Sequence, residues 1–231
     1  MLLLRWCLLA SGIAWIPPSS LPKLQTPNWE PTYDMALSTI AMPCNASGYM
    51  DAKVLAQYGL VSWDWSNAKA IWVNESPMDS ESKLATAAAQ VKAANPRAKV
   101  FTYRNSVHAM PWFPTVREKL EDPRYSGFFL RFDPAASNYS VPACDDAYDP
   151  PKCSVLYHDQ TQTPQPSRVP GGSTASGVCD ELCDCGAGVP CGFYLFNHLN
   201  GSMLRDWLIR EYFFGETGLG NENISGFFID D

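Results

Sequence analysis

Positive charge is scarce in this sequence. Its 231 residues include 17 Lys and Arg but 24 Asp and Glu, which gives a net charge of −7, and the Lys and Arg residues form no run. Binding to a phosphate backbone or to anionic lipid depends on clustered positive charge. We therefore expect neither nucleic acid nor a membrane surface among the partners of this protein.

Three catalytic motifs are also absent. The sequence contains no G-x-S-x-G nucleophile elbow, no P-loop and no H-E-x-x-H pair. Serine hydrolase, nucleotide-binding and zinc-protease functions therefore lack their usual local signatures. The hydrophobic fraction of 46% and the charged fraction of 18% indicate a globular chain with a substantial core.

Long apolar runs are missing after the first 16 residues. Residues 1–16 combine Arg5 with a short apolar core and small residues, as is typical of a secretory signal peptide. A signal anchor and a buried N-terminal element are the alternatives, but the segment is short for a bilayer and ends at Pro17-Pro18. Secretion is also indicated by five N-x-S/T sequons, which begin at Asn45, Asn74, Asn138, Asn200 and Asn223.

The cysteines are concentrated in one stretch that is poor in regular structure. Six of the eight lie there: Cys144, Cys153, Cys179, Cys183, Cys185 and Cys191. In an oxidising compartment we expect them to form disulfides, each contributing about 2–4 kcal/mol. The alternative is a zinc site on the last four of them, although their spacing lacks C-x-x-C pairs. If Cys7 is removed with the signal peptide, Cys44 makes the total odd, so one thiol is free or pairs outside these residues.

From Leu37 onward, short apolar runs of strand length alternate with helical segments. This alternation is typical of β/α units built on a largely parallel sheet. Helices are predicted from Asp79 to Ala94 and from about Ser202 to Phe214. Because crossovers between parallel strands are right-handed, successive units curl the same way and can close into a barrel. Six strands are predicted, at 37–42, 60–65, 99–103, 127–132, 192–196 and 226–229.

Residues 134–191 interrupt the alternation with Pro, Gly, Ser, Thr and Cys. We interpret them as a disulfide-rich insertion after the fourth strand, within one domain that spans 17–231. Long loops in compact domains are commonly functional. Since Asp133 begins this insertion, we expect it to overhang the edge of the sheet where the strands end.

Polar side chains follow the predicted strands. In parallel α/β folds, ligands bind where the carboxyl ends of the strands meet. These polar residues could simply mark where strands end and polar loops begin. That explanation does not account for the occurrence of carboxylates and aromatic rings together at the strand ends. Such a combination suits a sugar, which has an apolar face and a perimeter of hydroxyl groups. The residues in question are Asn45, Asp64 with Trp65, Arg104 with Asn105, Asp133, Asn197 with His198, and Asp230 with Asp231.

The last part of the chain resembles a known family. Residues 203–208 (MLRDWL) and 224–231 (ISGFFIDD) are similar to the R-D-W helix and the D/S-G-hydrophobic-D-D strand of glycoside-hydrolase-like (β/α)8 barrels. The resemblance is clearest over 197–231 and does not extend to the Cys/Pro-rich insertion. It implies a TIM-type α/β barrel with about six of its eight strands in this chain, a carbohydrate substrate, and hydrolysis without a cofactor.

Hydrolysis of a glycosidic bond requires one protonated carboxyl group and one ionised carboxylate. Successive residues of a strand point to opposite sides, so we expect Asp231 to face the pocket and Asp230 to pack behind it or to hold an Arg. Asp133 and Asp64 are the alternatives for the second carboxyl group. The candidates for substrate binding are Trp65, Tyr103, Arg104, Asn105, Asn197 and His198.

Two other functions remain open. In the first, the barrel binds carbohydrate without catalysis. In the second, Asp230, Asp231 and His198 hold a metal ion for a metal-dependent hydrolase. Because a barrel of eight units takes about 250 residues without insertions, we also expect the natural protein to continue beyond Asp231.

Overall fold

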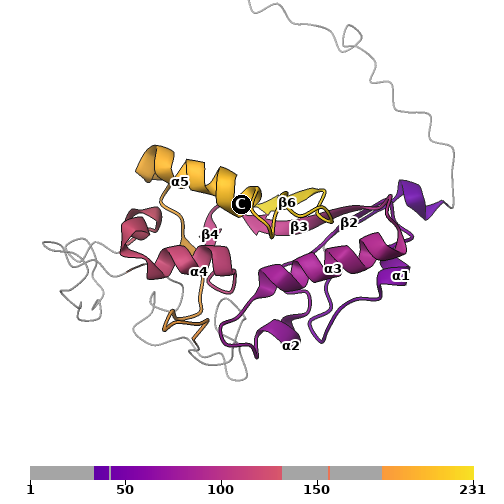
Figure 1. Ribbon diagram of the computed structural model, residues 1–231, viewed down its shortest axis with the longest axis horizontal. Coiled ribbons are helices and arrows are strands. Elements are labelled where there is room, and N and C mark those ends of the chain that lie inside the picture. The colour runs from indigo at the N-terminus through magenta and orange to yellow at the C-terminus, as the bar shows by residue number, and fades with distance from the viewer. Residues whose placement is uncertain (1–33, 42, 132–155, 157–183) are drawn as a thin grey trace, which may run out of the picture. The chain divides into compact units, whose positions relative to one another are not determined.

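The computed structural model describes residues 34–41, 43–131, 156 and 184–231. Its centre is a four-stranded parallel sheet whose strands lie side by side in the order in which they occur along the chain (Figure 1). The mixed α/β fold with a parallel sheet is therefore confirmed. The strands, in spatial order, are β1 (Thr39–Ala41), β2 (Leu60–Ser62), β3 (Lys99–Asn105) and β6 (Gly226–Asp230).

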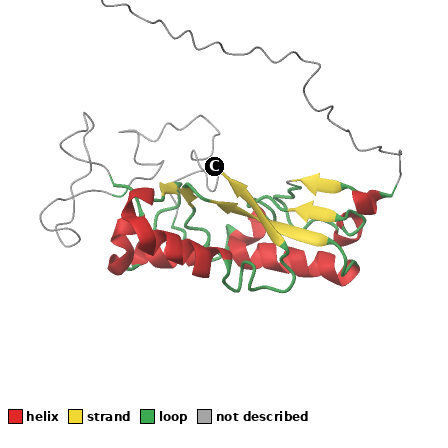
Figure 2. Ribbon diagram, turned by 90° about the horizontal axis from the view of Figure 1, so that it is seen from above, coloured by secondary structure: helices red, strands yellow, loops and turns green. Residues whose placement is uncertain are grey.

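The two faces of the sheet differ in what covers them. Val61 and Val100 are neighbours on β2 and β3, are fully buried, and belong to the same core as residues of α3. Figure 2 shows the helices on one side of the strands. The opposite face, here called the open face, includes Tyr103 and its β6 neighbour Phe228. Glycine at 226 allows β6 to pair with β3, because a Cβ atom there would lie 2.7 Å from the ring of its β3 neighbour Phe101.

Helix α3 (Ser80–Ala94) matches the helix predicted at 79–94. The side chain of Asp79 accepts a hydrogen bond from the backbone N–H of Ser82 at 2.9 Å, which is the capping role expected of an Asp before a helix. Asn95 adopts an extended conformation and ends the helix. Of the apolar residues at helical spacing, Leu84, Ala88 and Val91 are buried and Ala94, at the end of the helix, is exposed, so the spacing predicted the helix and most of its core face.

The second predicted helix is also present. Helix α5 (Gly201–Trp207) continues directly into a π-helical segment, η5 (Leu208–Phe213), which ends before Gly215. Further helices are η2 (Met35–Leu37), α1 (Ala52–Leu55), α2 (Lys69–Trp72), α4 (Pro114–Glu121), η3 (Pro123–Phe128) and η4 (His198–Asn200). Of the helices that the structure describes, none combines the length and hydrophobicity needed to cross a bilayer.

The predicted strands at 127–132 and 192–196 are not part of the parallel sheet. Pro123 begins the 3-10 helix η3, with Asp122 as its cap, and this helix extends through Phe128. Phe129 then forms an isolated antiparallel bridge with Phe196. Within the second segment, β5 (Tyr194–Leu195) pairs antiparallel with β4 (His108–Ala109). The described residues therefore contribute four parallel strands rather than six.

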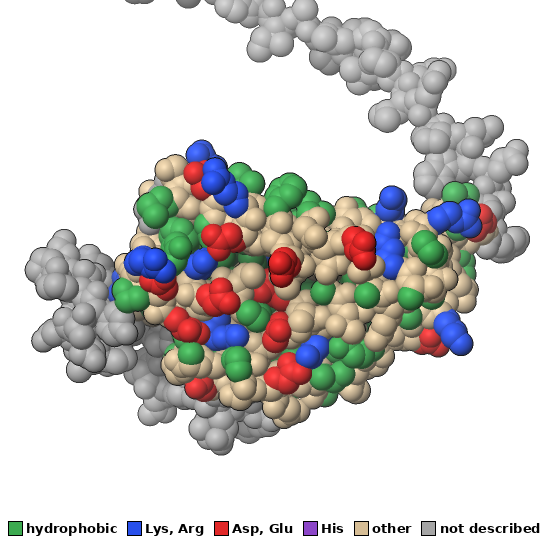
Figure 3. Space-filling model, viewed as in Figure 1, with side chains coloured by type: hydrophobic (Ala, Val, Ile, Leu, Met, Phe, Trp, Pro, Cys, Tyr) green, Lys and Arg blue, Asp and Glu red, His purple; other side chains and the backbone are tan. Residues whose placement is uncertain are grey.

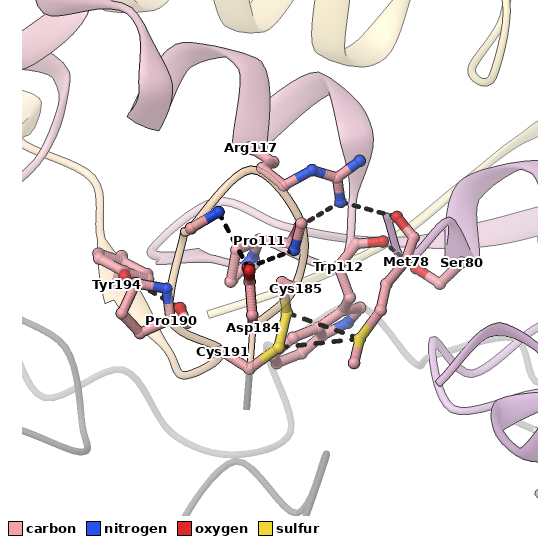
Figure 4. Close-up of a disulfide and its surroundings, with 12 residues drawn as sticks. Met78, Ser80, Pro111, Trp112, Arg117, Asp184, Cys185, Pro190, Cys191 and Tyr194 are labelled. Carbon is pink, nitrogen blue, oxygen red and sulfur yellow. Dashed lines mark hydrogen bonds between the residues drawn. A yellow bond between two sulfur atoms is a disulfide. The ribbon is translucent and has the colours of Figure 1, made fainter. Parts of the chain in front are cut away.

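One predicted disulfide lies within the described residues. Cys185 and Cys191 are joined, and both sulfur atoms lie 3.7 Å from the sulfur of Met78 (Figure 4). A zinc site that uses the thiolates of these two cysteines is incompatible with this bond. The backbone N–H of Met78 donates to the Cys185 carbonyl at 2.9 Å, and Arg117 donates to the Met78 carbonyl at 2.7 Å. The disulfide loop is thus attached to Met78, just before α3, and Met78 is in turn held by Arg117 of α4.

Several predictions fall outside the described residues. They concern the signal peptide at 1–16, the catalytic candidate Asp133, most of the insertion at 134–191, and the sequon at Asn138. Cys44 lies within the described residues, is exposed, and forms no disulfide there.

Candidate functional site

The carboxyl ends of β3 and β6 bring the two terminal acids beside Tyr103 and Asn105. The register of these strands places Tyr103 opposite Phe228 and Asn105 opposite Asp230. Paired residues of neighbouring strands point to the same face of a sheet, so Tyr103, Asn105 and Asp230 share the open face. This edge of the sheet is where the strand ends predicted a site.

A continuous set of hydrogen bonds connects the two acids. The hydroxyl of Tyr103 donates to Asp230 Oδ2 at 2.9 Å. The amide of Asn105 donates to Tyr103 Oη at 2.9 Å and to Asp231 Oδ2 at 3.1 Å. Strand alternation predicted that the two acids lie on opposite sides of the strand. Instead, one network holds both Asp230 and Asp231.

The backbone of Asp231 explains this difference. Its φ angle is +63°, in the left-handed region that Asp adopts more readily than most residues. Strand β6 ends at Asp230, so the alternation of side chains stops there. This conformation places the Asp231 carboxylate, whose side chain is 48% exposed, beside Asn105, which also donates to Tyr103, the partner of Asp230. Asp230 binds Tyr103 and not an Arg, which corrects the second part of that prediction.

His108 joins this network and was not singled out by the sequence. Its Nδ1 lies 3.2 Å from Asp231 Oδ2, and its side chain is 35% exposed. The interpretation of the sequence favoured His198 instead. A local signal for His108 exists: it follows the carboxyl end of β3 by three residues, so a turn there can bring it back to the sheet edge. We call Tyr103, Asn105, His108, Asp230 and Asp231 the carboxylate cluster.

The backbone around Asn105 fixes the orientation of its amide. Asn105 Oδ1 accepts hydrogen bonds from the backbone N–H groups of Val107, at 2.8 Å, and of His108. The oxygen is thereby committed to the turn that follows β3, and the Nδ2 group must face the acids. Asn105 is fully buried, so water does not compete for these bonds.

Tyr103 is held in its protonated form. Burial raises the pKa of its hydroxyl well above the usual tyrosine range, and the hydrogen bond to Asp230 raises that pKa further, although the bond from Asn105 partly opposes this. Tyr103 is therefore a hydrogen-bond donor to Asp230 over the whole physiological pH range.

Asp64 lies at the same edge of the sheet, after β2. Its Oδ1 accepts hydrogen bonds from the backbone N–H of Ser66, at 2.8 Å, and from the Ser66 hydroxyl. The Ser66 hydroxyl in turn lies 3.0 Å from the sulfur of Cys44. Asp64 thus stabilises the turn after β2, and the hydrogen bonds within the described residues do not connect it to Asp230 or Asp231.

Aromatic rings connect the Asp64 side of this edge to His108. The ring of Trp65 packs against Trp112, with centroids 5.0 Å apart, and against Phe193 at 6.4 Å. Phe193 stacks on the ring of His108 at 4.8 Å. Trp65 is thus close to the carboxylate cluster through Phe193, which the sequence did not single out and which follows Cys191 by two residues.

Three predicted binding residues contact neither acid of the cluster. Arg104 is fully buried beneath the sheet, where it pairs with Glu81 at 3.1 Å. Asn197 accepts from the backbone N–H of Leu199 at 3.2 Å and donates to the Gly127 carbonyl, so it holds the start of η4. His198 is exposed and bonds through Nε2 to the carbonyl of Ser106 at 2.7 Å, which places it next to the cluster without contact to either acid.

Asp and Glu side chains are spread across the middle of the face shown in Figure 3, in keeping with the net charge of −7. Within the described part of the chain, no group of three or more His, Cys, Asp or Glu side chains is arranged to hold a metal ion.

No family model matches this sequence, and no curated protein is significantly similar to it.

Proposed function

We propose that this protein is a glycoside hydrolase-like enzyme that uses carboxylates at the carboxyl ends of its parallel strands. The observation that carries the proposal is the shared network of Asp230 and Asp231. Two adjacent carboxylates, held from β3 by Tyr103 and Asn105, lie on the open face at the edge where parallel α/β enzymes bind substrates.

The two acids differ in a way that suits different roles. Asp230 is partly buried and is bound by a tyrosine hydroxyl, whereas Asp231 is about half exposed. The two side-chain contacts of Asp231 within the described residues, with Asn105 Nδ2 and His108 Nδ1, are both made by Oδ2. Oδ1 therefore remains available to a ligand. Asp231 is therefore proposed as the nucleophile or base, and either Asp64, after β2, or Asp133 as the second carboxyl group.

The order of the parallel strands supports a barrel rather than a doubly wound sheet. In doubly wound sheets the order reverses at a switch point, and helices cover both faces. Here each parallel strand is added to the same edge, in the order β1-β2-β3-β6, and the helices lie on one side (Figure 2). We propose that these are four consecutive strands of a (β/α) barrel whose interior is the open face.

Secretion is part of the same proposal. It is supported by the composition of residues 1–16, by the sequons, and by the disulfide between Cys185 and Cys191, because disulfides persist mainly in oxidising compartments. The expected partner is a carbohydrate, and no cofactor is required by the proposed chemistry.

The experiment is a comparison of turnover on a panel of chromogenic glycosides. We expect the wild type to hydrolyse at least one of them and Asp231→Asn to reduce kcat by at least about a hundredfold. The matched control is Asp206→Asn, since Asp206 is an exposed acid on α5 whose one ion pair within the described residues is with its neighbour Arg205. Unchanged turnover in Asp231→Asn contradicts the site. Glycan binding without turnover by the wild type would favour the non-catalytic alternative.

A further inference from the structure

The side-chain amide of Asn105 uses its full capacity for hydrogen bonds. Its Oδ1 accepts from the backbone N–H groups of Val107, at 2.8 Å, and of His108. Its Nδ2 donates to Tyr103 Oη at 2.9 Å and to Asp231 Oδ2 at 3.1 Å, whereas the contact of Nδ2 with His108 Nδ1 is longer, at 3.5 Å. Two acceptor sites and two hydrogen atoms are all that such an amide has.

These bonds allow one orientation of the amide. If oxygen and nitrogen were exchanged, Oδ1 would face the carboxylate of Asp231, and the NH2 group would face the backbone N–H groups of Val107 and His108. Asn105 is fully buried, so each bond lost in this way would leave an unsatisfied buried group. The Nδ2 group is therefore directed at Asp231 by the fold itself.

The main chain of Asn105 is held as well. Its backbone N–H lies 3.4 Å from the hydroxyl of Tyr212, to which it donates. Tyr212 is fully buried on the π-helical segment η5. On the other side, Asn105 is paired in register with Asp230 of β6. Asn105 is thus fixed through β6, through η5 and through the turn that follows β3.

Asp231, in contrast, is a half-exposed residue beyond the end of its strand. Its side chain is 48% exposed, and β6 ends at Asp230. The carboxyl end of β3 holds it at two points, because the Ser106 hydroxyl donates to the Asp231 carbonyl and Asn105 donates to Oδ2. A hydrogen bond from an amide to a carboxylate is charge-assisted and therefore stronger than a neutral one. The buried amide is thus a rigid support for an otherwise exposed acid.

We propose that Asn105 is the positioning residue of Asp231: its buried amide fixes Oδ2 and so presents Oδ1 to the substrate. This proposal rests on the function proposed above. The same amide binds Tyr103, which donates to Asp230, so Asn105 also sets the position of one acid relative to the other. A displacement of a reacting group by about 1 Å can lower a rate about a hundredfold.

The arrangement can be tested without any substrate. The two Nδ2 protons of Asn105 give a pair of ¹H–¹⁵N signals in labelled full-length protein, which are assigned by their loss in Asn105→Asp. Asp231→Ala removes the acceptor of one proton and leaves Tyr103 Oη for the other. We expect one signal of the pair to shift upfield much more than the other. If neither signal shifts, the proposal is overturned.

The catalytic effect is tested with Asn105→Asp. This variant keeps an oxygen for the N–H groups of Val107 and His108, but its second oxygen cannot donate to Asp231. We expect kcat to fall about a hundredfold with a smaller change in KM, because the reacting carboxylate is misplaced while the substrate contacts remain.

The matched control is Asn95→Asp. Asn95, at the end of α3, also accepts from a backbone N–H, that of Arg97, and donates from Nδ2 to a carbonyl, that of Ala56. It lies outside the carboxylate cluster, so we expect its kcat to equal that of the wild type.

The outcomes separate this role from the proposed function. If Asp231→Asn abolishes turnover but Asn105→Asp keeps the kcat of the wild type, Asp231 is catalytic and the role of Asn105 is overturned. A wild type that hydrolyses no glycoside contradicts the proposed function, while the amide signals still decide whether Asn105 holds Asp231. The same signals, measured in the wild type and in Asp231→Ala, decide this if Asn105→Asp does not fold.

Discussion

Glu81 and Arg104 form an ion pair at 3.1 Å in which neither side chain is exposed to solvent. The partners of Glu81 also include the backbone N–H and the hydroxyl of Thr115, both at 2.9 Å. The guanidinium of Arg104 donates to the carbonyls of Tyr212 and Thr217 and packs against the rings of Phe113, Tyr212 and Phe227. The pair thus links α3, β3, α4, η5 and β6 directly behind the carboxylate cluster.

Breaking this pair should destabilise the fold strongly. Arg104→Met leaves Glu81 buried without its positive partner, a change that costs about 3–5 kcal/mol. Urea denaturation measures the difference. The control is Lys83→Met, because Lys83 pairs with Glu75 at a partly exposed site and its loss should cost less than about 1 kcal/mol. An Arg104 variant that is as stable as the Lys83 variant would show that the pair contributes nothing to stability.

Removal of the disulfide should lower stability moderately. Cys185 and Cys191 are six residues apart, so the bond closes a short loop, for which the chain-entropy model gives about 2 kcal/mol. We expect Cys185→Ser/Cys191→Ser to lower Tm and, because Phe193 follows Cys191 closely, to lower kcat as well. Cys44→Ser is the control, since Cys44 forms no disulfide within the described residues. Equal Tm values for the double variant and the wild type would contradict the prediction.

Stability should decrease at alkaline pH because of two tyrosines. Burial is the main cause of the raised pKa of Tyr103 and of Tyr212, so both favour the protonated form in the folded state. Their contribution is fully present below the pKa of an unfolded tyrosine, about 10, and is lost as the pH rises above it. Urea denaturation between pH 8 and 11 should show this loss, and Tyr103→Phe should show a smaller decrease over the same range. An equal decrease in both proteins would exclude Tyr103 as a cause.

The sequons differ in accessibility. Both side chains make a hydrogen bond, Asn74 to the Ala70 carbonyl at 2.7 Å and Asn223 to Asn221 at 3.2 Å, but Asn74, two residues after α2, is exposed and Asn223 is partly buried. After expression through a secretory pathway, we expect Asn74→Gln to remove one glycan and Asn223→Gln to leave the glycan mass unchanged. Mass spectrometry before and after enzymatic deglycosylation measures both. A glycan on Asn223 but not on Asn74 would contradict the accessibility argument.

Elements with a strong local signal were predicted well. The helix at Asp79–Ala94 has a capping Asp, apolar residues at helical spacing and an Asn-Pro end, and all three act within one segment of chain. The strands β3 and β6 were also located within two residues, because their apolar runs are bounded by clear changes in composition.

Elements that depend on their partners were predicted less well. The apolar runs at 127–132 and 192–196 have the length of buried strands, but an apolar run does not specify whether its partner is parallel or antiparallel. In the structure, Tyr194 and Leu195 pair with β4, and Phe129 bridges to Phe196. Arg104 likewise follows a strand-like run and was assigned to the site, although strand alternation places it on the helix side with Glu81.

By itself, the sequence determined that the chain contains parallel β/α units and that acids, amides and aromatic rings follow their strands, because alternation and composition are properties of neighbouring residues. The tertiary structure decided which of these groups meet. The β3–β6 register set Asn105 beside Asp230, the left-handed φ angle of Asp231 brought both acids into one network, and the pairing of β4 with β5 placed His108 rather than His198 next to them. The contacts of β3 with the two acids join residues more than 120 positions apart, the pairing of β4 with β5 joins residues more than 80 positions apart, and no local pattern encodes either.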